Sequence, residues 1–216
     1  MNDVHVSEIF YSIQGESSYA GRPCAFVRLT GCNLRCSYCD TRYAYTEGVE
    51  MAIPEIVGRI QEFGCKLVEI TGGEPLLQEA TPELVAWVLD LGYTVLIETN
   101  GSQDISRIDS RVIKIVDFKC PTSGESAAND LANIDRLNPH DEVKCVIQTR
   151  EDFLFAKEIV RKIQQDPSRE NIIHFSPSFG VLAPKMLAEW ILADRLPVRL
   201  GLQLHKFVWD PNRRGV

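Results

Sequence analysis

The sequence predicts an α/β protein that forms a partial, open (β/α)6 barrel related to the TIM barrel. Strand-like and helix-like segments alternate through most of the chain, which is typical of βαβ units with a mainly parallel sheet. The chain has 216 residues, fewer than the roughly 250 that an eight-fold barrel usually takes. Two connections, 101–111 and 120–140, carry weak helix signals. We therefore expect about six strands, irregular and shortened helical connections, and a single domain spanning 1–216.

The expected strands are short apolar or alternating runs that end in polar residues or glycine. They cover residues 4–10, 25–30, 66–70, 93–97, 112–118, 141–148, 171–175 and 198–204. Residues 12–18 are polar and predict a loop after the first strand.

The expected helices cover residues 54–63, 81–92, 151–165 and 184–193. Proline near the start and glycine just past the end are typical of helix boundaries. Pro54 therefore suits the start of the first helix, and Gly64 and Gly92 are the expected stops of the first two. Thr81 is the expected N-cap of the second helix. In the third helix, the apolar residues Phe155, Ile159 and Ile163 at four-residue steps predict the buried face.

The bulk composition predicts the environment of the protein. The 30 acidic residues outnumber the 23 Lys and Arg residues, and the net charge of −7 disfavours tight binding to nucleic-acid phosphates. We find no apolar run of about 18 residues that would span a membrane, and no secretory pattern at the N-terminus. Seven cysteines, an odd number, argue against a disulfide framework and for a reducing cytoplasm.

Cys32, Cys36 and Cys39 follow the second expected strand with the spacing C-x3-C-x2-C. A loop this short can bend three thiolates toward one centre. Three thiolates saturate three irons of a [4Fe–4S] cube and leave the fourth iron open. Two other interpretations stay open at this point. A zinc site would need a fourth ligand, for which Asp40 is the nearest candidate, and the cysteines can also be buried thiols without a metal.

Polar residues follow several expected strands, at the edge where parallel sheets bind ligands. The glycines of Thr71-Gly72-Gly73-Glu74 let a backbone approach a ligand closely, although a plain turn is the simpler interpretation. Arg28 lies within an apolar strand, where it either faces outward or is buried with an anionic partner. Further candidates at strand ends or in the first loop are Gln14, Glu16, Glu98, Asp117, Lys119, Ser176, Ser178 and His205.

The cysteine spacing, followed one strand later by Gly72-Gly73-Glu74, resembles the radical S-adenosylmethionine (SAM) superfamily. Within it, the chain resembles the 7-carboxy-7-deazaguanine synthase family, which acts in 7-deazapurine (queuosine precursor) biosynthesis. The resemblance runs through essentially the whole chain in order. It rests on residues 12–16, 26–34, 39–41, 71–75, 98–101, 117–119, 203–206 and 214–216. Some family members carry an insertion between the first two cysteines, and this chain has the short form.

The resemblance implies a lyase with the radical SAM barrel, a [4Fe–4S] cluster on Cys32, Cys36 and Cys39, and SAM bound to the open iron. A flavodoxin-like donor would supply an electron to cleave SAM. The resulting 5′-deoxyadenosyl radical would take a hydrogen from C6 of 6-carboxy-5,6,7,8-tetrahydropterin. The ring would then contract with loss of ammonia to give 7-carboxy-7-deazaguanine. The resemblance also implies a homodimer, Mg2+ bound by Thr41 and the substrate, and Asp40 orienting the water ligands of that metal.

The family pattern also implies which residues bind the two small molecules, and it assigns no catalytic residue beyond the cluster and the SAM radical. The residues implied to bind SAM are Gly72, Gly73, Glu74, Asp117, Phe118, Lys119, Ser176, Pro177 and Ser178. The residues implied to bind the pterin are Ile13, Gln14, Gly15, Glu16, Arg28, Thr71, Glu98, His205 and Val216. Arg28 would pair with the substrate carboxylate, and the C-terminal carboxylate of Val216 would close the pocket.

Two other functions fit parts of the pattern. A radical SAM activating enzyme, which installs a glycyl radical on a partner protein, shares the short length and the three cysteines. Against it, Arg28, His205 and the polar loop 14–16 suit a small polar substrate. A zinc-binding interaction module would use the cysteines without SAM or a pterin. We expect no direct contact with nucleic acid or a membrane.

Overall fold

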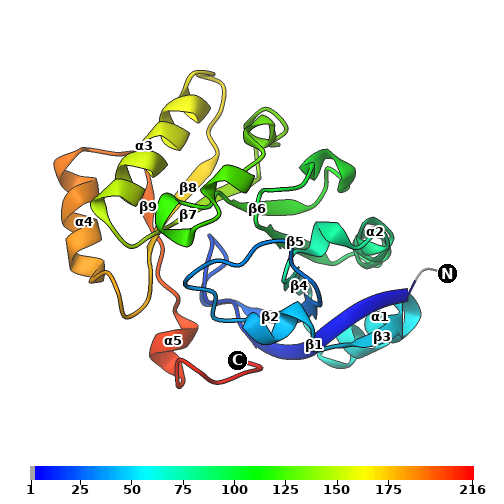
Figure 1. Ribbon diagram of the computed structural model, residues 1–216. Helices are drawn as coiled ribbons and strands as arrows, with labels where there is room; N and C mark the ends of the chain where they lie inside the picture. The colour runs from blue at the N-terminus through cyan, green and yellow to red at the C-terminus, as the bar shows by residue number, and fades with distance from the viewer. Residues whose placement is uncertain (1–2) are drawn as a thin grey trace.

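Nine strands form one sheet in the computed structural model, which describes residues 3–216 (Figure 1). Their bounds are β1 Asp3–Ile13, β2 Pro23–Leu29, β3 Val49–Ala52, β4 Leu67–Gly72, β5 Thr94–Thr99, β6 Ile113–Asp117, β7 Glu142–Ile147, β8 Ile172–Pro177 and β9 Arg199–Leu200. The order across the sheet is β3-β1-β2-β4-β5-β6-β7-β8-β9. Pairing is parallel from β2 through to β9, whereas β1 pairs antiparallel with both β2 and β3.

This arrangement confirms the predicted α/β class with an open, mostly parallel sheet. Strands β2, β4, β5, β6, β7 and β8 are the six main parallel strands, and the sheet does not close on itself. Met1 and Asn2, which belong to the predicted domain 1–216, lie outside the described residues.

Helices α1 Ile53–Glu62, α2 Thr81–Asp90, α3 Arg150–Gln164 and α4 Pro184–Ala193 cover the outer face of the curved sheet (Figure 1). The short α5 His205–Val208 lies in the C-terminal segment and has no buried residue. The larger hydrophobic core joins the inner faces of α1, α2, α3 and α4 to strand residues such as Val68 and Ile70 of β4. A smaller apolar cluster lies on the opposite face of the strands and contains Leu67, Phe26 and Leu96. This smaller cluster makes part of the inner face of the curved sheet apolar.

The connections after β5 and β6 have the weak helicity that their composition predicts. Only single turns of 3-10 helix form there, η3 Ile105–Arg107 in the first and η4 Pro121–Ser123, η5 Ser126–Ala128 and η6 Leu131–Ile134 in the second. Two further turns, η1 Arg42–Tyr45 and η2 Pro75–Leu77, follow β2 and β4.

Two details of the helix predictions are wrong. Thr81 is the first helical residue rather than the N-cap, and its hydroxyl donates to the carbonyl of Pro75 at 2.6 Å. In α3, the predicted Ile159 and Ile163 are buried, but Phe155 is only partly buried, and Phe153, Ala156 and Val160 complete the buried face. The expected stops at Gly64 and Gly92 are confirmed, since both adopt the left-handed backbone that ends a helix.

The strand predictions fail mainly at the two ends of the chain. β1 continues through Ser12 and Ile13 because these residues still pair with β2, so the loop begins later than expected. The last strand, predicted at 198–204, is only the two residues of β9, because the chain leaves the sheet edge after Gly201. β3 has only four residues and was not predicted.

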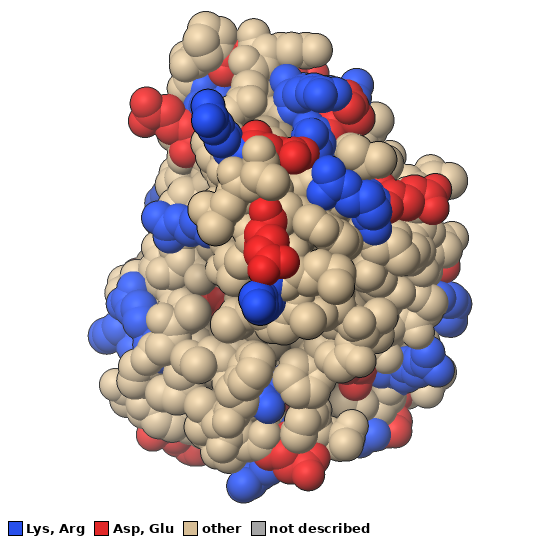
Figure 2. Space-filling model, turned by 90° about the vertical axis from the view of Figure 1, so that its left-hand side faces the viewer, with Lys and Arg blue, Asp and Glu red and all other residues tan. Residues whose placement is uncertain are grey.

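No helix within residues 3–216 is long and apolar enough to cross a membrane. On the flank that carries α4 and α5, basic and acidic side chains are interspersed with uncharged surface (Figure 2).

The start of α3 provides a test of the fold. Asp152 is fully buried, and its carboxylate accepts hydrogen bonds from the backbone of Thr122, Gln148 and Thr149. It thus caps the helix and ties η4 to it.

We expect Asp152→Ala to lower the free energy of unfolding by about 3 kcal/mol, because several buried donors lose their acceptor. Urea unfolding measures this, and Glu151→Ala, on the exposed side of the same turn, is the matched control. An equal effect of the two changes would contradict this account.

Candidate functional site

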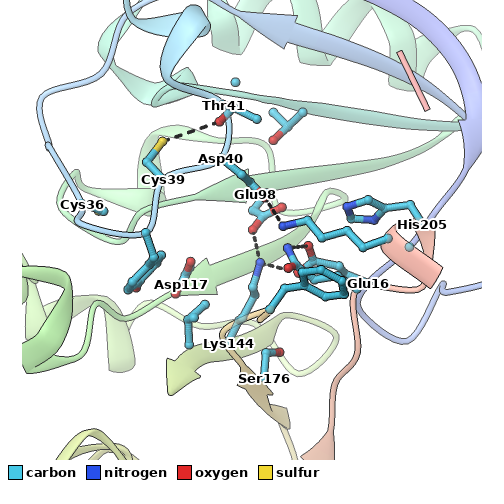
Figure 3. A pocket seen from close by; sticks show the side chains of 18 of the residues that line it. Glu16, Cys36, Cys39, Asp40, Thr41, Glu98, Asp117, Lys144, Ser176 and His205 are labelled. Carbon is cyan, nitrogen blue, oxygen red and sulfur yellow. Dashed lines mark hydrogen bonds and ion pairs between the residues drawn. The ribbon is translucent and has the colours of Figure 1, made fainter. Parts of the chain in front are cut away.

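A cavity of about 510 Å³ lies at the carboxyl ends of the parallel strands (Figure 3). Its wall combines the cysteine loop, the loop after β1, the ends of β4 to β8, and the C-terminal segment. The residues singled out from the sequence that line it are Ile13, Gln14, Gly15, Glu16, Arg28, Cys32, Cys36, Cys39, Asp40, Thr41, Thr71, Gly72, Gly73, Glu98, Asp117, Lys119, Ser176, Pro177, Ser178, His205 and Val216.

Two residues expected to bind SAM lie away from this wall. Glu74 is fully buried, and its carboxylate accepts hydrogen bonds from Thr99 Oγ1 at 2.8 Å and from the backbone N–H of Asn100 at 2.6 Å. It therefore braces the end of β5 against the turn after β4. Phe118 is fully buried in the larger hydrophobic core. The side chains of both residues serve the scaffold.

The three cysteines of the loop are free thiols on the cavity wall. Backbone hydrogen bonds hold the loop, from Gly31 N to Ala44 O at 2.8 Å and from Ser37 N to Ser123 O at 3.0 Å. Within residues 3–216, no three His, Cys, Asp or Glu side chains converge on one metal ion. The donor set of three free thiols on one wall fits a [4Fe–4S] cluster, in which three thiolates bind three irons and leave the fourth iron open.

The Gly72-Gly73 turn packs directly on the start of this loop. A Cβ at Gly73 would lie 2.1 Å from the carbonyl oxygen of Gly31, and one at Gly72 would lie 2.2 Å from that of Leu29. The backbone N–H of Glu74 donates to Gly31 O at 2.7 Å. The glycines are therefore required for contact between two protein segments, in addition to any ligand that the turn accepts.

Asp40 and Thr41 place oxygen atoms beside the cysteines. The Thr41 hydroxyl lies 3.8 Å from Cys39 Sγ (Figure 3). Asp40 forms an ion pair with Lys206 of α5 at 2.5 Å. Burial opposes ionisation of Asp40, but the Lys206 ammonium outweighs it and lowers the pKa of the carboxyl. Asp40 is thus an anion at the mouth of the cavity.

A lysine that the sequence interpretation did not single out lies among the acidic residues of the interior. The ammonium of Lys144 on β7 is 2.5 Å from Glu16 Oε2 and 2.7 Å from Glu98 Oε1 (Figure 3). Glu69 on β4 also lines the cavity and accepts a hydrogen bond from the Gln14 side chain. A charged residue inside an apolar strand is the signal that pointed to Arg28, and it applies equally to Lys144 and Glu69.

Arg28 faces the cavity, which answers the question that the sequence left open. Its Nε donates to Glu8 Oε1 at 2.7 Å, and the hydroxyl of Tyr43 donates to the same oxygen at 2.7 Å. Burial alone would lower the pKa of Arg28, but the facing Tyr43 and Glu8 raise it, so the guanidinium stays charged. One edge of the guanidinium is thus anchored while the side chain lines the cavity.

The end of the chain closes the side of the cavity next to β1. The backbone N–H of Leu204 donates to Gly15 O at 2.8 Å, and Gln203 Nε2 donates to Glu16 Oε1 at 2.9 Å. His205 begins α5 rather than ending a strand, and its ring fills the space that a side chain at Gly15 would need. Burial lowers the pKa of His205, so the ring is an uncharged hydrogen-bonding group at neutral pH. Gln203 and Lys206 join the wall without having been predicted.

On the β6 side, Asp117 and Lys119 form an ion pair of 2.6 Å at the cavity wall. Asp117 Oδ1 is buried and has no hydrogen-bond partner in the described chain. Because an unpaired buried acceptor is costly, this oxygen suits a ligand that donates a hydrogen bond, such as an amino or hydroxyl group.

Comparison with known proteins agrees with this geometry. Residues 26–118 match the family model of the radical SAM superfamily. A 7-carboxy-7-deazaguanine synthase of Koribacter versatilis is 47% identical, covering 99% of this chain and 100% of the relative. That of Chlorobaculum tepidum is 49% identical over 99% of this chain and 97% of its own length. The crystal structure of QueE from Escherichia coli has the same fold, with a TM-score of 0.76 and 23% identity over 94% of this chain and 95% of that one.

A relative this similar over the full length shows the family. This chain belongs to the 7-carboxy-7-deazaguanine synthase family of the radical SAM superfamily, which implies a [4Fe–4S] cluster and SAM as cofactors.

Proposed function

We propose that this protein is a radical SAM lyase that converts 6-carboxy-5,6,7,8-tetrahydropterin to 7-carboxy-7-deazaguanine and ammonia in 7-deazapurine biosynthesis. One observation carries the proposal: a single cavity joins three free cysteine thiols to an arginine and a set of buried carboxylates. The names of the full-length relatives support the same reaction. The cavity is walled on one side by the C-terminal segment, which suits a small molecule better than the protein substrate of an activating enzyme.

Cys32, Cys36 and Cys39 would hold the cluster. When bound, the cluster and SAM supply a 5′-deoxyadenosyl radical that abstracts a hydrogen atom from the substrate. Gly73 and the unpaired Oδ1 of Asp117 would face SAM, with the backbone of the Gly73 turn already fixed against the cysteine loop. Ser176 and Ser178, at the end of β8, would complete this side of the site.

The other half of the cavity would bind the pterin. Arg28 would pair with the substrate carboxylate, because its guanidinium is charged, partly buried and anchored by Glu8. Gln14, Glu98 and the uncharged ring of His205 offer hydrogen bonds to a flat heterocycle with amino and carbonyl groups. Holding the substrate in one orientation is what this reaction needs, since a primary alkyl radical attacks almost any nearby C–H bond.

Thr41 would bind Mg2+ together with oxygens of the substrate, and Asp40 would orient the water ligands of that metal. A hard cation with few protein ligands and several waters is typical of Mg2+. The position of Asp40 and Thr41 at the cavity wall supports this assignment.

We also propose that residues 1–216 act as one catalytic domain, in the cytoplasm, as a homodimer that receives electrons from a flavodoxin-like protein. These assignments rest on the family resemblance.

The decisive test is turnover by the anaerobically reconstituted protein with reductant, SAM, Mg2+ and the carboxytetrahydropterin. We expect 7-carboxy-7-deazaguanine as the product and about four irons per chain. Cys36→Ala should lose both cluster and product, because one iron loses its thiolate. Cys65→Ala, a free thiol that does not line the cavity, is the control. A wild-type protein that binds iron but makes no product would refute the function.

Arg28 tests the orientation of the pterin. We expect Arg28→Ala to raise the KM for the pterin by about 100-fold while SAM affinity stays the same, because a buried guanidinium–carboxylate pair is lost. Steady-state kinetics and SAM titration measure the two effects, and Arg59→Ala on the exposed side of α1 is the control. Equal losses for both ligands would place Arg28 in the scaffold instead.

Thr41 tests the metal. Thr41→Val should keep the cluster but raise the Mg2+ concentration for half-maximal activity by about ten-fold, since the methyl group offers no lone pair. Thr41→Ser should restore the wild-type value, and Thr46→Val, at an exposed position of the same segment, should change nothing. An unchanged Mg2+ dependence in Thr41→Val would remove this residue from the metal site.

A further inference from the structure

In the interior of the barrel, the Lys144 ammonium lies among the carboxylates of Glu16, Glu69 and Glu98. Lys144 on β7 is 7% exposed, and its Nζ contacts Glu16 in the loop after β1 and Glu98 on β5 (Figure 3). Glu69 on β4 lines the same cavity without contacting Lys144 directly. Three segments that are far apart in the sequence thus meet at one side chain.

Because these groups are shielded from solvent, the contacts between them decide whether each group is charged. Burial alone would raise the pKa of Glu16, but the Lys144 ammonium reverses this and lowers it to about 2. Burial raises the pKa of Glu98, and Lys144 limits the rise. Glu69 is buried beside the other two carboxylates, and burial followed by their repulsion raises its pKa well above the ordinary value. Burial favours neutral Lys144, but the carboxylates of Glu16 and Glu98 raise its pKa well above the ordinary value.

We propose that Lys144 is a positioning residue for the substrate: its ammonium holds the Glu16 and Glu98 carboxylates together, facing the pterin. Without it, two carboxylates from different segments would repel each other in a partly buried site and move apart or take up protons. The inference deepens the proposed function, because Glu16 and Glu98 are residues proposed to contact the pterin.

The other charged groups around the pair already have partners or are neutral. Asp117 of β6 pairs with Lys119, and Asp40 of the cysteine loop pairs with Lys206. The groups that face Lys144, Glu16 and Glu98 from the neighbouring elements are Glu69, Asp117, Lys119, Asp40, Lys206, Arg28 and His205. Lys144 is therefore the cation in direct contact with both carboxylates.

The kinetic test compares the reconstituted wild type with Lys144→Met and Lys144→Arg across pH. In Lys144→Met we expect kcat/KM at neutral pH to fall on the order of 100-fold, mainly through KM. Because Glu16 and Glu98 then take up protons at higher pH, the acidic limb of the kcat/KM profile should move up by about two pH units. Lys144→Arg keeps the charge and should leave that limb close to the wild-type position.

The matched control is Lys157→Met, which removes the ion pair of α3 with Asp194 away from the cavity. It should leave the profile unchanged. Loss of activity in Lys144→Met without a shift of the acidic limb would overturn the proposal, because that pattern indicates a merely structural lysine.

A second measurement needs neither turnover nor the Lys144 variants. Carbon-13 NMR of carboxyl-labelled glutamate in the substrate-free, reconstituted protein can follow Glu16, with its signal identified by its absence in Glu16→Gln. We expect Glu16 to stay ionised down to the lowest pH at which the protein remains folded, in line with a pKa of about 2. Titration of Glu16 near the ordinary value of 4.5 would overturn the role of Lys144. If the wild type shows no pterin turnover, the proposed reaction fails, and this titration still decides whether Glu16 is held ionised beside Lys144.

Discussion

The close contact between the Gly72-Gly73 turn and the start of the cysteine loop fixes the geometry on which the site depends. β2 and β4 are parallel neighbours, with Arg28 opposite Thr71 and Leu29 opposite Gly72. The two strands end side by side, and only glycine at the end of β4 allows their backbones to touch there. One backbone contact thus sets the position of the cysteines relative to Arg28 and Thr71. The proposed radical source and the proposed carboxylate anchor are held by the same pair of strands.

The second constraint is the burial of charge in an interior that is apolar at one end. Phe26 and Leu96 belong to the apolar cluster of this inner face, while the polar residues gather toward the carboxyl ends of the strands. Ion pairs buried in this way seldom add net stability, since desolvation offsets most of the attraction. The pair of Lys114 and Asp141 is also buried, but neither residue lines the cavity. The pairs that do line it, such as Lys144 with Glu16, are better explained by binding than by stability.

The sequence was most informative where one local rule decides the structure. The spacing of the cysteines and the glycines after β4 predicted the loop and the turn, and the predicted helix 184–193 matches the bounds of α4, which begins at a proline. Residues whose role depends on distant partners could not be predicted in this way. Its charge inside an apolar strand marks Lys144 as unusual, but its partners are known only when β5 and the loop after β1 are placed beside it. Glu74 matched a family motif, yet its carboxylate turns inward because three donors of the turn and β5 surround it.

The C-terminal segment shows why the last part of the site was hardest to predict. An open sheet leaves one side of the cavity without a strand, and residues 203–216 supply that wall after β9 has ended (Figure 1). Its charged contacts, Lys206 with Asp40 and Arg214 with Glu47, are partly exposed, and such pairs contribute little individually. The backbone hydrogen bond from Leu204 to Gly15, and the packing of the His205 ring on that glycine, are more specific. A side chain at position 15 would occupy the space of the ring, so His205 can lie here only because residue 15 is glycine. The proposed substrate site is therefore complete only when the loop after β1 meets the C-terminal segment. The family pattern placed His205 and Val216 at the site, but the contacts that bring them there depend on the folded chain.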